Sequence, residues 1–121
     1  MSGLTILLAG GRLAYAPGET MRGAVAWSDA AASRRLELRL LWRVTHAGGE
    51  DAGTADVSVI DGETAAGERP FTLRLPLAPF SYRGASWRLD WHLELIDIAA
   101  RVAARVDLVI APGGEPVTVV R

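Results

Sequence analysis

The chain has 121 residues, enough for one domain that buries roughly 65% of the surface exposed by its unfolded chain. Half of its residues are apolar and 22% are charged, a composition typical of an ordinary globular domain, so a disordered or fibrous protein is excluded. The net charge is −1, and the 13 basic and 14 acidic side chains are interspersed along the chain. Such a chain has no field able to hold a phosphate backbone, so we expect no nucleic-acid partner.

Absent residue types narrow the class further. All 13 basic residues are Arg, and Lys, Asn, Gln and Cys do not occur, a bias that favours a bacterial source with GC-rich coding sequence. Without Cys there is no disulfide framework, thiolate metal site or cysteine nucleophile. The apolar run 4–9 lacks the basic lead-in and the length of a secretory signal, and no segment approaches about 18 consecutive apolar residues. We expect a cytoplasmic protein with no direct membrane insertion.

Short strands and tight turns are predicted for the first part of the chain. Residues 5–8, 12–15 and 21–27 are the candidate strands. The Gly-Gly pair at 10–11 predicts a bulge or bend. Ala-Pro-Gly-Glu at 16–19 suits a type II turn, because Pro sets φ at the second position and Gly supplies a positive φ at the third.

Period-2 alternation of apolar and polar residues dominates the rest of the chain. Residues 36–44, 87–95 and 102–110 each place apolar side chains on one face and mostly polar side chains on the other, as half-buried strands do. Shorter candidate strands are 56–60, 71–75 and 117–120. The Ala-rich segments 28–35 and 98–105 are predicted to be a loop and a hairpin, respectively.

Seven or more strands, separated by turn signals every 8–12 residues or so, predict two packed sheets. No internal repeat, linker or low-complexity tract divides the chain. We therefore expect one all-β domain over residues 1–121, an antiparallel two-sheet β-sandwich of about seven to eight strands.

Three segments in order carry a resemblance to a known family. They are Tyr-Ala-Pro-Gly-Glu-Thr-Met-Arg-Gly-Ala-Val at 15–25, Phe-Thr-Leu-Arg-Leu-Pro at 71–76, and Pro-Phe-Ser-Tyr-Arg-Gly at 79–84 followed by the aromatic strand 87–93. Together with the alternating strand 36–44, they resemble the arrestin family over most of residues 13–98. The residues also suit structural roles: Gly23 for close packing, Pro76 to end a ladder, and Gly84 for a turn closed to residues with a Cβ.

The resemblance implies an immunoglobulin-like, arrestin-like sandwich that serves as a scaffold or adaptor. Arrestins usually pair two such lobes, whereas this chain holds one, so a second lobe supplied by another chain is one possibility. No residues here match the charged core or the phosphate sensors of receptor-regulating arrestins. Receptor binding and phosphopeptide recognition are therefore not carried over.

Candidate chemical sites are few. His46 and His92 are the only histidines, too few for a His-based zinc site unless carboxylates complete it, and the acidic stretch 50–63 lacks the order of a calcium loop. Ser81 has no nucleophile-elbow motif and no evident base, and is expected to be a loop residue that caps its own backbone. Tryptophans 42, 87 and 91 share the apolar phase and are expected in the core. We expect no catalytic residues, no metal, no cofactor and no enzyme activity.

One predicted sheet face suggests a partner. If strands 36–45, 87–98 and 102–110 share a sheet, its outer face mixes arginine with apolar side chains, which is typical of an interface. The candidate partner-binding residues are Arg39, Leu41, Arg43, Arg88, His92 and Ile96. An ordinary solvated surface with cross-strand ion pairs and a solvated His92 is the open alternative.

These expectations define two functional hypotheses. The first is a non-enzymatic adaptor or scaffold that binds a protein partner or a second copy of itself, through a sheet face or strand edge, as a homodimer or a subunit of a larger complex. The second is a small-ligand-binding or hydrolytic domain whose site lies on end loops at 48–68 and 79–84.

Overall fold

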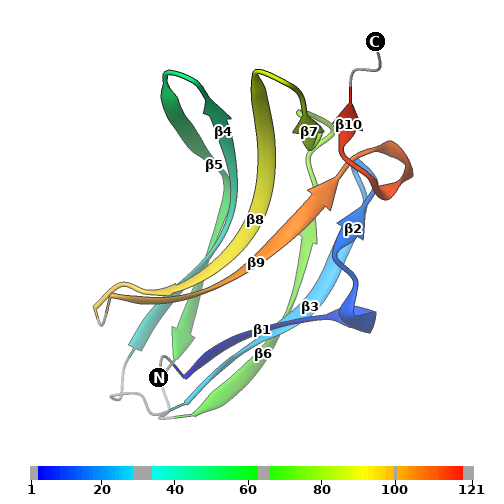
Figure 1. Cartoon of the computed structure of the whole chain (residues 1–121). Helices are drawn as coiled ribbons and strands as arrows, with labels where there is room; N and C mark the ends of the chain where they lie inside the picture. The colour runs from blue at the N-terminus through cyan, green and yellow to red at the C-terminus, as the bar shows by residue number, and fades with distance from the viewer. Residues whose placement is uncertain (1–2, 29–33, 63–65, 100, 119–121) are drawn as a thin grey trace.

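A computed structural model describes residues 3–28, 34–62, 66–99 and 101–118. Within these residues the chain forms ten strands and two short 3₁₀ turns, Ala9–Gly11 and Pro112–Gly114 (Figure 1). The strands are β1 (Leu4–Leu8), β2 (Ala14–Tyr15), β3 (Thr20–Trp27), β4 (Arg34–His46), β5 (Gly49–Gly62), β6 (Gly67–Arg74), β7 (Tyr82–Arg83), β8 (Trp87–Asp97), β9 (Val102–Ile110) and β10 (Val117–Thr118). Seven of them have five or more residues, which confirms the predicted all-β sandwich.

The smaller sheet has three antiparallel strands in the order β1-β3-β6. Alternate residues of the central strand β3 face inward, so Met21 and Val25 are fully buried and Trp27 nearly so. Leu4 of β1 and Leu73 of β6 complete the buried set on this sheet. Period-2 alternation thus produces one apolar face, as expected for a half-buried sheet.

The larger sheet follows the order β10-β7-β8-β4-β5, and β9 lies on the other side of β8 from β4. β4 pairs along its whole length with β5 on one side and with β8 on the other. The edge of β8 that faces away from β4 is shared by two strands. β9 pairs with Trp91–Asp97 of β8, and β7 pairs with Arg88 and Leu89 of β8. Beyond that point β9 pairs with β2 in parallel. The predicted sharing of one sheet by the three long alternating strands is confirmed.

The core lies between the two sheets. The alternating residues Leu36, Leu38 and Leu40 of β4 meet Leu93 and Leu95 of β8 on its inner face, all of them 3% exposed or less. Burial of each such side chain stabilises the fold by about 1.5–3 kcal/mol.

Curvature shapes the outer face of the larger sheet. β4, β5 and β8 bend along their length, and the smaller sheet packs on their convex side (Figure 1). A β-bulge adds to the bend, because Leu40 pairs with Asp56 while Leu41 pairs with Thr54, which leaves Ala55 without a partner on β4. The outer face is therefore concave, and no other element among the described residues covers it.

β5 is much longer than the predicted strand at 56–60. It runs over Gly49–Gly62, so the predicted end loop at 48–68 is wrong for most of its length. The reason is that β5 is an edge strand whose side chains are mostly exposed on both faces, which removes the apolar alternation that marks a half-buried strand. The predicted loop at 28–35 lies mainly outside the described residues, and Arg34 and Arg35 already belong to β4.

Two predicted turns have different outcomes. The type II turn at 16–19 is confirmed, because Gly18 has a φ of +76° and the Glu19 amide donates to the Ala16 carbonyl at 3.2 Å. The position of Gly84 is closed to residues with a Cβ, as predicted, but the reason is the neighbouring Tyr82 ring, which a Cβ would overlap, and not a positive φ.

The tryptophans divide between core and surface. Trp91 is 1% exposed, and Trp42 packs partly buried against the core, as predicted. Trp87 is 43% exposed, so its predicted core position is wrong. It opens β8 at the end of the sheet beyond the core, where it stacks on Tyr82 with ring centroids 4.1 Å apart.

Candidate functional site

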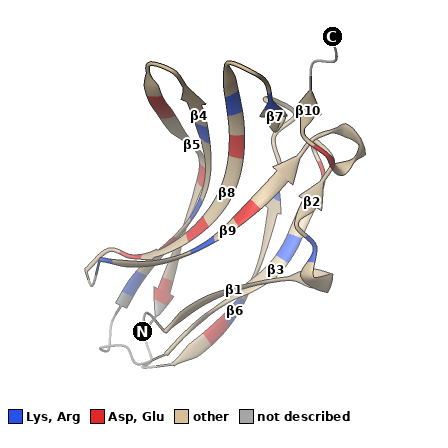
Figure 2. Ribbon diagram, in the orientation of Figure 1, with Lys and Arg blue, Asp and Glu red and all other residues tan. Residues whose placement is uncertain are grey.

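The six predicted partner-binding residues lie on the concave outer face of the larger sheet. β4 contributes Arg39, Leu41 and Arg43, and β8 contributes the other three. Their registers interlock, since Leu41 lies opposite His92 and Thr45 lies opposite Arg88. The structure thus brings together residues that are far apart in the sequence, and Figure 2 shows blue and red segments following one another along these strands.

Ion pairs on this face run mostly along single strands. Arg39 contacts Glu37 at 2.9 Å, Arg88 contacts Asp90 at 3.1 Å, and Arg105 contacts Asp107 at 2.9 Å, each between residues two apart. A longer contact of 3.9 Å joins Arg43 to Glu50 on β5. Partly exposed pairs of this kind contribute little stability individually. Most of the positive charge on this face is therefore neutralised locally.

His92 occupies the centre of the face and is only 4% exposed, so the alternative interpretation of a solvated histidine is wrong. Leu41 and Asp107 flank it in register on the two neighbouring strands. Burial lowers its pKa, and the positive charge of Arg105 lowers it further. Its Nδ1 has no hydrogen-bond partner among the described residues. The charges of Arg43, Glu94, Arg105 and Asp107 also affect its pKa, so charged groups from β4, β8 and β9 all lie near the ring.

A strand edge was predicted as a binding route, but its location on β5 was not predicted from the sequence. Val57 and Val59 are 47% and 51% exposed, and they point to the outer face beside Arg39 and Glu37. In the part of the chain that the structure describes, β4 is the one strand that pairs with β5. The segment was predicted to be a strand, but its place at the edge of the sheet depends on long-range pairing and left no local signal.

Charge is distributed unevenly on β5. Its 14 residues include four acidic side chains and no basic one, namely Glu50, Asp51, Asp56 and Asp61. All four are exposed. Asp51 also contacts His46 at 3.3 Å. The edge therefore offers unpaired backbone groups in an acidic setting.

Ser81 does not cap its own backbone, so that prediction is wrong. It is 3% exposed, and its Oγ accepts a hydrogen bond from the Ile110 amide at 3.0 Å. Its own amide donates to the Ile110 carbonyl at 2.7 Å, and its carbonyl accepts from the Val117 amide at 2.8 Å. Ser81 thus joins the end of β9 to the start of β10. Its partner Ile110 is 29 residues away, so sequence spacing held no signal for this role.

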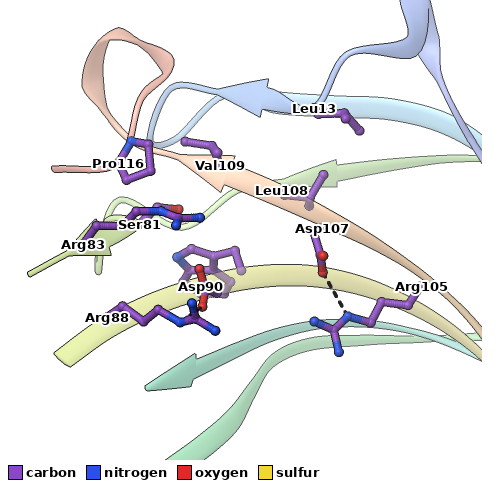
Figure 3. Close-up of a pocket in the computed structure, with 11 residues that line it drawn as sticks. Leu13, Ser81, Arg83, Arg88, Asp90, Arg105, Asp107, Leu108, Val109 and Pro116 are labelled. Carbon is purple, nitrogen blue, oxygen red and sulfur yellow. Dashed lines mark hydrogen bonds and ion pairs between the residues drawn. The ribbon is translucent and has the colours of Figure 1, made fainter. Parts of the chain in front are cut away.

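A pocket of about 310 Å³ lies where β9 separates from β8 (Figure 3). β8 continues beside β7, while β9 turns to pair with β2, and the pocket fills the resulting fork. We call it the fork pocket. Its lining consists of Leu13, Ser81, Arg83, Arg88, Asp90, Trp91, Arg105, Asp107, Leu108, Val109 and Pro116.

Neither metal-binding nor catalytic groups stand out among the described residues. Nowhere in the described ranges do three or more His, Cys, Asp or Glu side chains gather closely enough to hold a metal ion. Among the described residues, the Ser81 hydroxyl hydrogen-bonds to a backbone amide, and no His or carboxylate is bonded to it that could act as a catalytic base. A separate search of the same residues finds no helix that could span a membrane.

Comparisons with known proteins bear on the fold. No family model matches the chain, and no curated protein matches it by sequence. Among solved structures, it is similar to Spo0M, a sporulation control protein from Bacillus subtilis, with a TM-score of 0.68 and 18% identity over 91% of this chain and 49% of that one. The alkylpurine DNA glycosylase AlkC from Pseudomonas fluorescens overlaps weakly, with a TM-score of 0.40 and 8% identity over 91% of this chain and 31% of that one.

The likeness to Spo0M confirms the arrestin-like sandwich that the sequence motifs predicted. This chain spans about half the length of Spo0M. At 18% identity the likeness concerns the fold alone.

Proposed function

We propose that this arrestin-like sandwich is a non-enzymatic protein-binding adaptor or scaffold that receives an extended segment of its partner along the edge of β5. The observation that carries the proposal is the exposure of Val57 and Val59 on a 14-residue strand whose outer edge is unpaired within the described residues. Unpaired N–H and C=O groups on an edge strand are a template for a further strand, and exposed apolar side chains beside them give the added strand something to pack against.

The charge of β5 selects the kind of partner. The strand has four acidic side chains and no basic one, so it would repel a second copy of the same edge. A segment in which apolar residues alternate with basic ones is complementary, because its apolar side chains would lie beside Val57 and Val59 while its basic ones face Asp56. We therefore favour a basic, extended segment of another protein over self-assembly.

The adjoining outer face supports the same role. A strand added to β5 would extend the concave sheet, so partner residues beyond that strand would lie over Leu41, Ile96 and the arginines. A mixture of apolar and arginine side chains is typical of interface cores and their rims. Spo0M, the similar structure, is a control protein, which is in keeping with a binding role.

The hypothesis of a small-ligand or hydrolytic domain has weaker support. Most of its first loop, 48–68, is strand β5 and the start of β6. A thermal-shift screen with calcium, zinc, sugars and phosphoesters tests this second hypothesis. A saturable shift with any of them would favour it.

The edge proposal is tested by the double variant Val57→Lys with Val59→Lys. Lysine on an edge strand blocks strand addition and repels a basic segment, while the exposed positions leave the core untouched. The probe is a short peptide of alternating Val and Arg, titrated into the isotope-labelled chain. We expect shifts confined to β5 and the adjacent face in the wild type, and at least about tenfold weaker binding in the variant.

The matched control is Leu7→Lys with Leu77→Lys, two apolar residues that are 48% and 72% exposed away from β5. It should bind the peptide as the wild type does. Equal binding by the β5 variant, or shifts elsewhere on the chain, would refute the edge proposal. Concentration-dependent dimers in sedimentation that disappear in the β5 variant would instead identify a second copy as the occupant.

A further inference from the structure

We propose that the fork pocket binds a monoanionic carboxylate that carries a small apolar group. This site is separate from the β5 edge and does not depend on the protein-binding proposal. The volume of about 310 Å³ is at the lower end of the range for small-molecule sites, which indicates a compact ligand.

The backbone creates this cavity. The last pair between β8 and β9 joins Trp91 to Leu108, after which β9 leaves toward β2. Ser81 closes the bottom of the fork by bonding to Ile110, and the Trp91 indole is fixed by its own bond to the Pro79 carbonyl at 3.0 Å. The walls are therefore held by hydrogen bonds before any ligand binds.

Charge in the fork pocket favours a single negative charge. It is lined by three arginines and two aspartates, a balance of +1. Arg88 is paired with Asp90 and Arg105 with Asp107, whereas Arg83 has no carboxylate partner among the described residues. A guanidinium matches a carboxylate with two parallel hydrogen bonds. A dianion would be repelled by the two aspartates, so a monoanion is the better fit.

A buried hydroxyl adds a second donor. Ser81 lines the fork pocket and is 3% exposed, and its Oγ accepts from the Ile110 amide. The proton of that hydroxyl has no acceptor among the described residues. A donor buried without an acceptor costs free energy, and a ligand oxygen in the fork pocket would remove that cost.

The remaining wall is apolar and accounts for the body of the ligand. Leu13, Val109 and Pro116 line the pocket on one side, and Leu13 is 51% exposed (Figure 3). Covering these side chains would stabilise an acid with an aromatic or branched aliphatic group more than acetate. The same carboxylate could belong to a free small acid or to the C-terminus of a protein ending in an apolar residue.

The test is titration of the full chain with phenylacetate, followed by amide chemical shifts. We expect saturable shifts around the fork pocket and none with the neutral analogue phenylacetamide. Arg83→Gln should weaken binding at least about tenfold, since a bond to a charged group is lost. Arg22→Gln, an exposed arginine on β3 outside the pocket, should bind as the wild type does.

A gain-of-binding variant guards against a merely structural effect. Asp107→Asn releases the Arg105 guanidinium and removes a negative charge, so it should tighten phenylacetate binding several-fold. Two arms identify the source of the carboxylate: tighter binding of a short peptide with a free C-terminal leucine points to a protein C-terminus, and tighter binding of phenylacetate to a free acid.

Three results would overturn the proposal: no saturable shifts with phenylacetate or the free peptide, equal binding of the amidated compounds, or unchanged affinity in Arg83→Gln. The variant Val57→Lys with Val59→Lys should bind phenylacetate normally. Failure of the edge proposal and failure of this one are therefore distinguishable.

Discussion

Three glycines lie opposite aromatic side chains on neighbouring strands. Gly23 pairs with Phe71, Gly67 with Trp27, and Gly53 with Trp42. In each pair the aromatic ring lies where a Cβ on the glycine would be. The missing side chain therefore lets the ring lie flat on the strand, which packs apolar area against backbone that a larger residue would displace.

Gly23→Ala should destabilise the fold by about 1–3 kcal/mol, the usual cost of overpacking. A Cβ there would overlap the Leu7 carbonyl oxygen and lie 2.8 Å from the Phe71 ring, and the backbone cannot yield cheaply. Urea unfolding measures the loss. Gly48→Ala is the control, because its nearest neighbour is the exposed His46 ring at 3.3 Å. Similar losses in both variants would contradict the packing explanation.

His92 should make stability depend on pH. Its pKa in the folded chain is below the ordinary 6.5, because burial and the charges of Arg105 and Arg43 outweigh the opposing effect of Glu94 and Asp107. Between that lowered pKa and 6.5 the unfolded chain binds a proton that the folded chain does not. The contribution of neutral His92 to the free energy of unfolding is therefore fully present above pH 6.5 and is lost as the pH falls from 6.5 through the lowered pKa.

The free energy of unfolding, measured by urea at about pH 7.5 and about pH 5.5, should fall less between these values in His92→Gln than in the wild type. The comparison uses the difference between the two pH values, so a constant cost of the substitution cancels. His46→Gln, at the exposed end of β4, is the control that removes the other histidine. An unchanged dependence in His92→Gln would show that this residue is not the cause.

At the scale of elements, the ends of β9 and β10 depend on one serine. Ser81 makes three hydrogen bonds, two with Ile110 at the end of β9 and one with Val117 at the start of β10. These bonds hold Ser81 in the lining of the fork pocket.

Ser81→Ala should cost about 1–3 kcal/mol, because the amide of the fully buried Ile110 loses its acceptor. Amide hydrogen exchange should rise at Ile110 first, and urea unfolding gives the total cost. Ser86→Ala, in an exposed turn before β8, should be close to neutral. Unchanged exchange at Ile110 would indicate that water replaces the hydroxyl.

At the scale of the whole molecule, curvature gives the larger sheet two different faces. The convex face packs on the smaller sheet, and the concave face remains open within the described residues (Figure 1). Leu41 and Ile96 are half-buried on that open face without belonging to the core between the sheets.

Leu41→Arg with Ile96→Arg should leave the chain folded, since arginine can reach solvent from an uncovered face, and should abolish assembly with a partner protein. Circular dichroism checks folding. Sedimentation and pull-down from the source organism, compared with the wild type, check assembly. Leu7→Arg with Leu77→Arg is the control that changes charge equally elsewhere. Unchanged assembly in the Leu41 variant would remove the concave face from the proposed interface.

The two-sheet architecture could be predicted from the amino-acid sequence. The alternation of apolar and polar residues in β4, β8 and β9 indicates which face of each strand is apolar. Because this pattern is local in the sequence, it predicts the strands without a structure. Turn chemistry at Gly18 was likewise local. The ordered motifs at 15–25, 71–76 and 79–93 predicted the arrestin-like sandwich, and the likeness to Spo0M confirmed it.

Three features of the surface could be located only from the tertiary structure. The burial of His92 depends on its place between β4 and β9, the open edge of β5 on its lack of a second neighbour in the described residues, and the fork pocket on the separation of β8 and β9. Each of these depends on pairing between residues far apart in sequence, which local periodicity does not encode.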